Sequence, residues 1–154
     1  PMAYWRLGEL SGSALGDASG FHPATSAGGI TRGAAGALTA DTDKASTFNG
    51  SSTGTAYTAV VGNARDTVSV EAWVRTTTRS GGKIVGFGNS STGTSSLADR
   101  HLYMDNGGRL YFGMMSGPFH ALATTGAYND GAWHHVVGAF EGTTMRLYVD
   151  GVLR

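Results

Sequence analysis

Three glutamates are the residues of this 154-residue chain best suited to acid–base chemistry: Glu9, Glu71 and Glu141. Hydrolysis of a glycosidic bond requires two carboxyl groups about 5–9.5 Å apart. Glu71 lies in an alternating segment, but the residues two and five positions after it, Trp73 and Thr76, carry no carboxyl group. The sequence therefore predicts no catalytic residue, and we expect the protein not to be an enzyme.

The adjacent histidines His134 and His135 suggest a metal site or an acid–base pair. Neighbouring residues of a strand point to opposite faces, so the two imidazoles cannot bind one ion together. The alternation places Trp133, His135 and Val137 on one face and His134 on the other. We therefore interpret the pair as structural.

A cluster of polar residues surrounds the start of one predicted strand, namely Asp99-Arg100-His101 with Asp105. It could line a ligand groove together with Tyr103 and Tyr111, or it could be an ion-paired loop that anchors a hairpin. Aromatic rings stack on the apolar faces of sugars, and planar polar groups bond their hydroxyls. On the first interpretation, the ligand-binding residues are Tyr103, Tyr111 and Arg100.

A calcium ion needs six to eight oxygen ligands from carboxylates, amides and carbonyls. The richest local supply is Asp41-Thr42-Asp43, and Asp17 in a Ser/Gly-containing loop is another donor. The predicted metal ligands are therefore Asp41, Asp43 and Asp17, with Ca²⁺ as the expected cofactor. The alternative is that these aspartates are solvated turn residues.

Short alternating segments separated by glycine turns fill most of the chain, and no segment has a helical stripe. Hairpin turns are indicated at residues 105–108, 141–142 and 150–151. The run 11–36, rich in Gly, Ala and Ser, is expected to be loops with at most one short strand, and 90–96 a polar loop. Strands are expected near residues 4–10, 45–50, 56–61, 68–76, 83–88, 101–104, 109–115, 119–124, 133–140 and 145–149. The predicted fold is all-β and antiparallel.

Alternation also predicts which side chains form the core. Several strands have one aliphatic face and one face that mixes aromatic with polar residues, so the aliphatic faces should meet in a two-sheet sandwich. Trp73 lies on a mixed face, and we expect it to be packed rather than to bind a ligand. The predicted inward residues are Val68, Val70, Ala72, Val74, Leu110, Phe112, Met114, Met145, Leu147 and Val149.

The composition indicates a single domain, residues 1–154, as a segment of a longer chain. Eleven basic and eleven acidic residues cancel. A neutral chain without a basic stripe argues against nucleic acid as a partner. No stretch approaches the roughly 20 apolar residues of a membrane span, so we expect no membrane insertion. The absence of cysteine removes disulfides and zinc–thiolate sites.

Five segments occur in an order that resembles a laminin-G-like domain of the concanavalin A-like lectin/glucanase superfamily. They are Tyr4-Trp5-Arg6-Leu7-Gly8-Glu9, Thr47-Phe48-Asn49-Gly50-Ser51, Val70-Glu71-Ala72-Trp73-Val74, Trp133-His134-His135-Val136-Val137 and Leu147-Tyr148-Val149-Asp150-Gly151. The resemblance implies a jelly-roll sandwich that binds glycans or proteins, often with a structural calcium. The Glu-x-Asp-x-x-Glu motif of the glucanase branch is absent. The opening residues resemble modules of actinobacterial secreted proteins and of phage tail or decoration proteins.

Members of this superfamily usually continue past the Val-Asp-Gly turn, whereas this chain stops at Arg154. We therefore expect a jelly roll that lacks its final strands, with an open sheet edge that a neighbouring chain could complete. The expected function is a recognition or adhesion module for a glycan or a cell-surface or virion protein. Its expected location is extracellular or on a virion surface, within a larger protein. The alternatives are a structural decoration or tail domain of a virion and, third, a glycoside hydrolase.

Overall fold

The computed structural model contains β-strands and no helix among the residues it describes, which confirms the all-β prediction. Accordingly, no described helix could span a membrane. The described residues are 1–60, 62, 65–91, 95–115 and 117–154. The chain divides into two compact units, residues 1–62 with 90–96 and residues 63–89 with 97–154.

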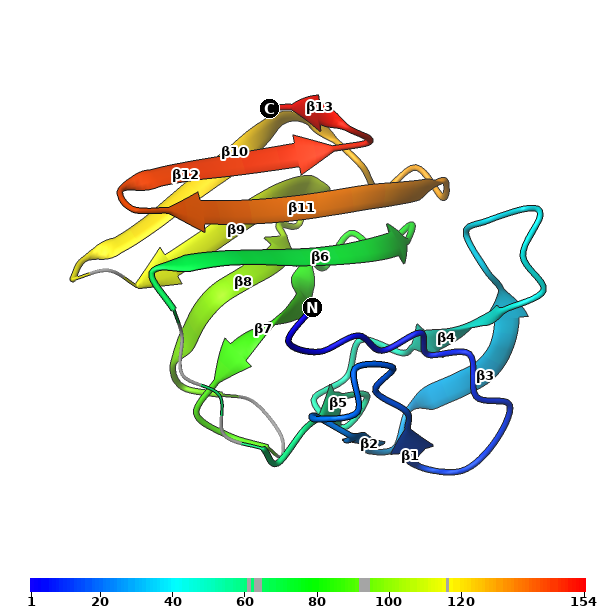
Figure 1. The fold of residues 1–154 in the computed structure, drawn as a ribbon. Coiled ribbons are helices and arrows are strands. Elements are labelled where there is room, and N and C mark those ends of the chain that lie inside the picture. The colour runs from blue at the N-terminus through cyan, green and yellow to red at the C-terminus, as the bar shows by residue number, and fades with distance from the viewer. Residues whose placement is uncertain (61, 63–64, 92–94, 116) are drawn as a thin grey trace. The chain divides into compact units, whose positions relative to one another are not determined.

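The larger unit is built from two four-stranded antiparallel sheets (Figure 1). The front sheet has the order β13-β12-β11-β6, with β6 (Thr67–Arg75), β11 (Trp133–Glu141), β12 (Thr144–Val149) and β13 (Val152–Leu153). The back sheet has the order β10-β9-β8-β7, with β7 (Gly82–Gly88), β8 (Ala98–Met104), β9 (Arg109–Met115) and β10 (Phe119–Ala127).

The core of this unit lies between the two sheets, as the alternation predicts. Phe112 and Leu110 of β9 and Leu147 and Val149 of β12 are fully buried. Val68, Val70 and Val74 of β6 pack against this cluster. Removal of this apolar surface from water is the main stabilising contribution, about 25 cal/mol per Å². The predicted sandwich with aliphatic inner faces is confirmed.

Two-residue turns connect the last strands of the front sheet. Asp150 and Gly151 have φ values of 53° and 77° and join Val149 to Val152, its partner in the register. Positive φ at both central residues is the requirement of a type I′ hairpin turn, which Asp-Gly satisfies. The predicted turn at 150–151 therefore leads into β13, a short strand that the sequence did not indicate.

The smaller unit contains a three-stranded sheet and a two-stranded sheet. The first has the order β1-β2-β5, with β1 (Ala14–Leu15), β2 (Ala24–Ser26) and β5 (Ala56–Tyr57). The second pairs β3 (Ile30–Ala35) with β4 (Lys44–Phe48). The strand predicted at 45–50 corresponds to β4, whereas the run 11–36 holds three strands instead of at most one.

The strand predicted at residues 4–10 is wrong. Within the described part of the chain, its only sheet pairing is an isolated antiparallel bridge between Trp5 and Asp17. Leu7 has φ of 59°, in the left-handed region, so the extended backbone is interrupted there. The predicted strand 56–61 is shortened to β5, and its end, Val61, lies outside the described residues, as do residues 92–94 of the predicted polar loop.

Candidate functional site

A row of aromatic side chains crosses the outer face of the back sheet. We define the aromatic row as His101 and Tyr103 of β8, Tyr111 of β9 and Phe119 of β10. Tyr103 and Tyr111 are direct partners in the strand register, and their ring centroids lie 4.8 Å apart. His101 stacks on Tyr103 at 4.9 Å and on Phe119 at 6.1 Å. The rings therefore form one continuous stack across three strands.

The ring planes determine which parts of the row a ligand can reach. The Tyr103 and Tyr111 rings are inclined by only 16° at a 4.8 Å separation, so their faces overlap in an offset stack. The ring faces that meet in this stack are therefore closed to a ligand. Phe119 ends the row and is 51% exposed. The row thus has two tightly stacked rings at its Tyr111 end and a more accessible ring at its Phe119 end.

Small residues make room for the row on the sheet. A Cβ atom added to Gly113 would lie 3.0 Å from ring atoms of both His101 and Phe119. Ala121 and Ala123 of β10 are the register partners of Gly113 and Tyr111, and both are exposed. Glycine at 113 therefore lets the two rings approach each other above the backbone of β9.

Charged groups border the tyrosines. Asp105 accepts hydrogen bonds from the Tyr111 hydroxyl at 3.1 Å and from Arg109 Nε at 2.8 Å. The Arg109 guanidinium lies 5.7 Å from the Tyr111 ring centroid. Burial alone would raise the pKa of Asp105, but hydrogen bonds from Arg109 and Tyr111 outweigh it and lower that pKa. The carboxylate is therefore charged at neutral pH and fixes the Tyr111 end of the row.

His101 is neutral at physiological pH. Burial lowers its pKa below the ordinary value of 6.5, and the nearby charge of Lys83 lowers it further. Its Nδ1 atom is buried and has no hydrogen-bond partner among the described residues. Burial also raises the pKa of Tyr103, and the neighbouring Tyr111 and Asp105 add to the rise. Its hydroxyl is therefore a protonated hydrogen-bond donor.

Arg100 is not part of this site, contrary to the prediction. It is only 6% exposed and shares the buried positions of β8 with Leu102 and Met104, opposite to Tyr103. Its guanidinium bonds the carboxylate of Asp99 and the backbone oxygen of Arg65. The structure therefore brings together Tyr103 and Tyr111 and separates Arg100 from them. The ion pair between Arg100 and Asp99 agrees with the ion-paired interpretation of the cluster.

Sequence reasoning named His101 as a possible groove residue beside Tyr103 and Tyr111, but it missed Phe119. His101 occurs two residues before Tyr103, so alternation places both on the same face. Phe119 could not be found in this way, because its proximity depends on the β9–β10 register, in which it pairs with Met115.

The two adjacent histidines lie on opposite faces of β11, as predicted. His134 is 9% exposed, and its ring nitrogens lie 2.8 Å from Asp150 and 3.1 Å from Asp130. His135 instead stacks on Trp73, with centroids 5.0 Å apart. Trp73 is 48% exposed, so the expectation that it is packed in the sandwich is wrong. It lies on the outer face of β6, an edge strand.

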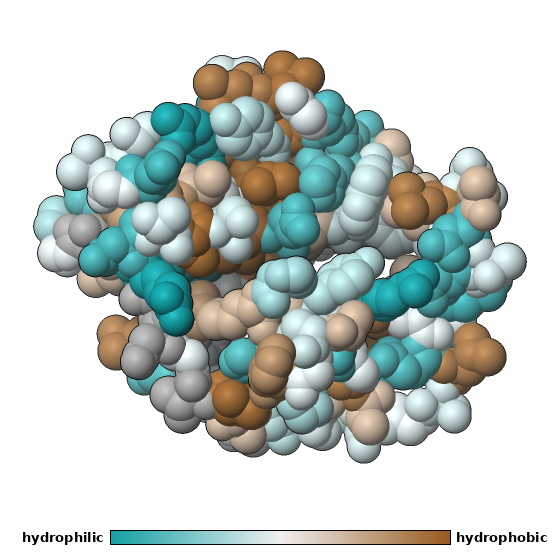
Figure 2. All heavy atoms as spheres, in the orientation of Figure 1, coloured by the Kyte–Doolittle hydropathy of each residue, from teal (hydrophilic) through white to brown (hydrophobic). Residues whose placement is uncertain are grey.

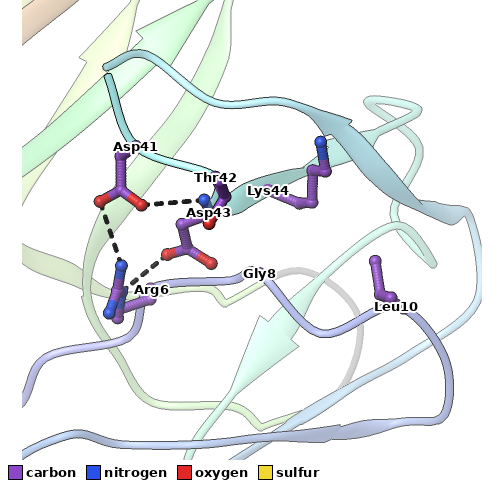
Figure 3. Close-up of a pocket in the computed structure, with 7 residues that line it drawn as sticks. All are labelled: Arg6, Gly8, Leu10, Asp41, Thr42, Asp43 and Lys44. Carbon is purple, nitrogen blue, oxygen red and sulfur yellow. Dashed lines mark hydrogen bonds and ion pairs between the residues drawn. The ribbon is translucent and has the colours of Figure 1, made fainter. Parts of the chain in front are cut away.

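Asp41 and Asp43 of the smaller unit lie together at Arg6, in a shallow pocket of about 440 Å³ (Figure 3). Arg6 Nε is 2.7 Å from an Asp43 carboxylate oxygen, and its terminal nitrogen is 3.3 Å from Asp41. The positive charge between the two carboxylates is thus supplied by a guanidinium. This arrangement does not fit a calcium ion, which would have to displace Arg6.

Asp17, the third predicted metal ligand, binds backbone N–H groups of its own loop and of the N-terminal segment. Its carboxylate accepts backbone hydrogen bonds from Tyr4, Ser19, Phe21 and His22 at 2.7–3.1 Å. Within the described part of the chain, no three His, Asp or Glu side chains gather closely enough to hold a metal ion. The three aspartates are therefore not brought into one site.

The three glutamates have separate partners. Glu71 lies 3.4 Å from His135, and Glu141 lies 3.7 Å from Arg146. Glu9 accepts a hydrogen bond from the backbone of Gly16. None of these ion pairs and hydrogen bonds joins two carboxyl groups, as an acid and base of a glycosidase would require around one bond.

Comparison with known families identifies the class of protein to which the chain belongs. The family model of the concanavalin A-like lectin/glucanases superfamily matches residues 36–154. The chain belongs to this superfamily, and the predicted resemblance to a laminin-G-like domain is confirmed. No curated protein and no solved structure matches the chain. Membership makes it a module of the carbohydrate-binding or adhesion type in general.

Proposed function

We propose that this protein is a non-catalytic module that binds a glycan along the aromatic row of the back sheet. One observation carries the proposal: Phe119, His101, Tyr103 and Tyr111 form a continuous stack on an outer sheet face. Aromatic side chains with a few fixed polar groups are common in the lining of small-molecule binding sites.

A sugar chain would contact the row in two ways. The accessible ring of Phe119 offers an apolar surface for the C–H groups of one sugar unit. The Tyr103 hydroxyl, which has no hydrogen-bond partner among the described residues, would donate to a sugar hydroxyl. Asp105 and Arg109 would hold the Tyr111 ring in place from the other end. The polar contacts would fix the direction of the chain, and the rings would supply contact area.

The partners of the three glutamates support a non-catalytic role. Each glutamate contacts a different group: a histidine, an arginine or a backbone N–H. We further propose that the module acts outside the cell or on a virion surface, as part of a larger protein. Its neutral net charge and low content of charged residues, 14%, suit recognition of hydroxyl-rich ligands better than of nucleic acid.

A glycan array followed by calorimetry on the purified chain tests the proposal. Tyr103→Ala and Tyr111→Ala should each weaken binding about tenfold or more, because each removes a stacked ring. Tyr103→Phe removes only the hydroxyl and should cost about 0.5–1.5 kcal/mol of binding free energy. Tyr148→Ala, a tyrosine of the front sheet, is the matched control and should leave binding unchanged. Absence of binding to every glycan, or equal losses in Tyr148→Ala and Tyr103→Ala, would overturn the proposal.

An assembly role in a virion is the second candidate. The observation in its favour is that β7 and β10 end one sheet and β6 and β13 end the other, with no further described strand paired to them. Open strand edges can accept a strand of a neighbouring chain. Light scattering separates the two: an assembling module should have a mass above that of the monomer, 15.8 kDa.

A further inference from the structure

The front sheet carries a second cluster of aromatic and charged side chains, far from the aromatic row because the core lies between the two sheets. Glu71, Trp73 and Arg75 occupy alternate positions of β6 and all point outward. Figure 2 shows polar and apolar atoms side by side over this sheet. The three residues present a carboxylate, an indole ring and a guanidinium in one line along the strand.

Trp73 is fixed by its neighbour but not covered by it. One face of the indole stacks on His135, its register partner, with 5.0 Å between centroids and 25° between planes. β6 is the last strand of the front sheet, and no second described ring stacks on Trp73. Since 48% of the residue is exposed, the indole is pre-oriented and offers apolar surface at the sheet edge.

Arg75 is positioned without being neutralised. Its guanidinium lies 5.1 Å from the ring centroid of Trp133, and no described carboxylate forms an ion pair with it. Arg146, on the same outer face, differs in this respect, because it pairs with Glu141 at 3.7 Å. A planar guanidinium held over an aromatic ring is preorganised to bind a carboxylate with two parallel hydrogen bonds.

Glu71 places a negative charge at the end of the cluster opposite to Arg75. Its carboxylate lies 3.4 Å from His135 Nε2, which holds it on the opposite side of Trp73 from Arg75. A carboxylate is acceptor-only and bonds sugar hydroxyls while repelling another anion. Residues two apart on a strand are separated by roughly 6.6 Å, which a sugar ring with one attached carboxylate can span.

We propose that Trp73 and Arg75 form a second carbohydrate site, specific for a sugar that carries a carboxylate, a hexuronate. The apolar face of the sugar packs on Trp73, its carboxylate bonds Arg75, and its hydroxyls on the far side face Glu71. This site goes beyond the proposed function, since it uses the other sheet and shares no residue with the aromatic row.

Calorimetry with a tetramer of galacturonate and its methyl ester tests the site, since the ester keeps the rings and removes the charges. The wild-type chain should bind the acid about tenfold more tightly than the ester, as expected for one charge-assisted contact. Arg75→Gln should remove this difference. Arg146→Gln, the matched control, should preserve it. Trp73→Ala should weaken binding of both forms about tenfold or more, and Trp73→Phe, which keeps a ring against His135, should weaken it less.

Three results would overturn this site: no binding of the acid, equal binding of acid and ester, or equal effects of Arg75→Gln and Arg146→Gln. A sulfated neutral tetramer that binds as tightly as the acid would show a general anion site and overturn the specificity for a carboxylate. Tyr103→Ala should leave binding of galacturonate unchanged. Calorimetry with these variants therefore distinguishes an error in this proposed site from an error in the proposed aromatic row.

Discussion

His134 at the start of β11 bonds Asp150 in the β12–β13 turn, with 2.8 Å between Nδ1 and a carboxylate oxygen. The other oxygen of Asp150 accepts the backbone N–H of His135 at 2.9 Å. The second ring nitrogen of His134 lies 3.1 Å from Asp130. A single buried imidazole thus links the end of one loop, a strand and a hairpin turn, and it does so best when both nitrogens carry protons.

This link predicts a pH dependence of stability. Burial alone would lower the pKa of His134, but its bonds to Asp150 and Asp130 outweigh burial and raise it above 6.5. The stabilisation is therefore complete below pH 6.5 and is lost as pH rises through the raised pKa. The bonded Asp130 and Asp150 have pKa values below 3.8, so their contribution is lost only as pH falls through those lowered values.

Urea unfolding across pH 3–9 measures this dependence, with a maximum of stability expected between about pH 4 and 6.5. His134→Gln keeps hydrogen-bonding capacity but cannot titrate, so its stability should no longer fall above pH 6.5. A variant that follows the wild-type profile on this alkaline side would disprove the assignment to His134.

Gly138→Ala should destabilise the sandwich. A Cβ at this position of β11 would lie 2.3 Å from the ring of Phe112, which is fully buried in the opposite sheet. Overpacking of a close-packed core typically costs about 1–3 kcal/mol. Gly126→Ala in β10 is the control, because nothing lies within 4 Å of its added Cβ. Chemical denaturation should show a loss for the first variant and a change within about 0.5 kcal/mol for the second.

Calcium and chelator should leave the melting temperature of the wild-type chain unchanged, because Arg6 already compensates the charges of Asp41 and Asp43. Arg6→Gln removes that charge and leaves two carboxylates side by side. In this variant, added calcium should raise the melting temperature, whereas magnesium, which demands stricter octahedral geometry, should do so less. Scanning calorimetry measures both. A wild-type chain that melts earlier in chelator would instead show that a cation competes with Arg6.

The strands of the larger unit could be predicted because most of them alternate and are separated by turns with Asp, Asn and Gly. β9, Arg109–Met115, has the predicted bounds, and its inward Leu110 and Phe112 are buried. Trp73 was misjudged because alternation fixes the face of a residue but not whether its strand lies at an edge. β6 is an edge strand, so its outer face has a neighbour on one side only.

The site was only partly predictable for a related reason. Arg100 has φ of 43°, and the β7–β8 register is irregular nearby, between Val85 and Phe87. Its side chain lies inward and bonds Asp99, in agreement with its alternation with Leu102 and Met104, although a charged residue is usually exposed. Phe119 reaches His101 only through the pairing of β9 with β10. Contacts between strands depend on register, which the spacing of residues along the chain does not fix.

The aromatic row draws its rings from three separate strands, so it exists only when two hairpins are correctly aligned. A shift of one residue in β9 would turn Tyr111 inward and bring Phe112 to the surface, because side chains alternate across a strand. Ligand binding at the row is therefore also a reporter of strand alignment. A preparation containing misaligned molecules would bind with unchanged affinity but with fewer sites per chain, which makes binding stoichiometry a direct measure of the correctly folded fraction.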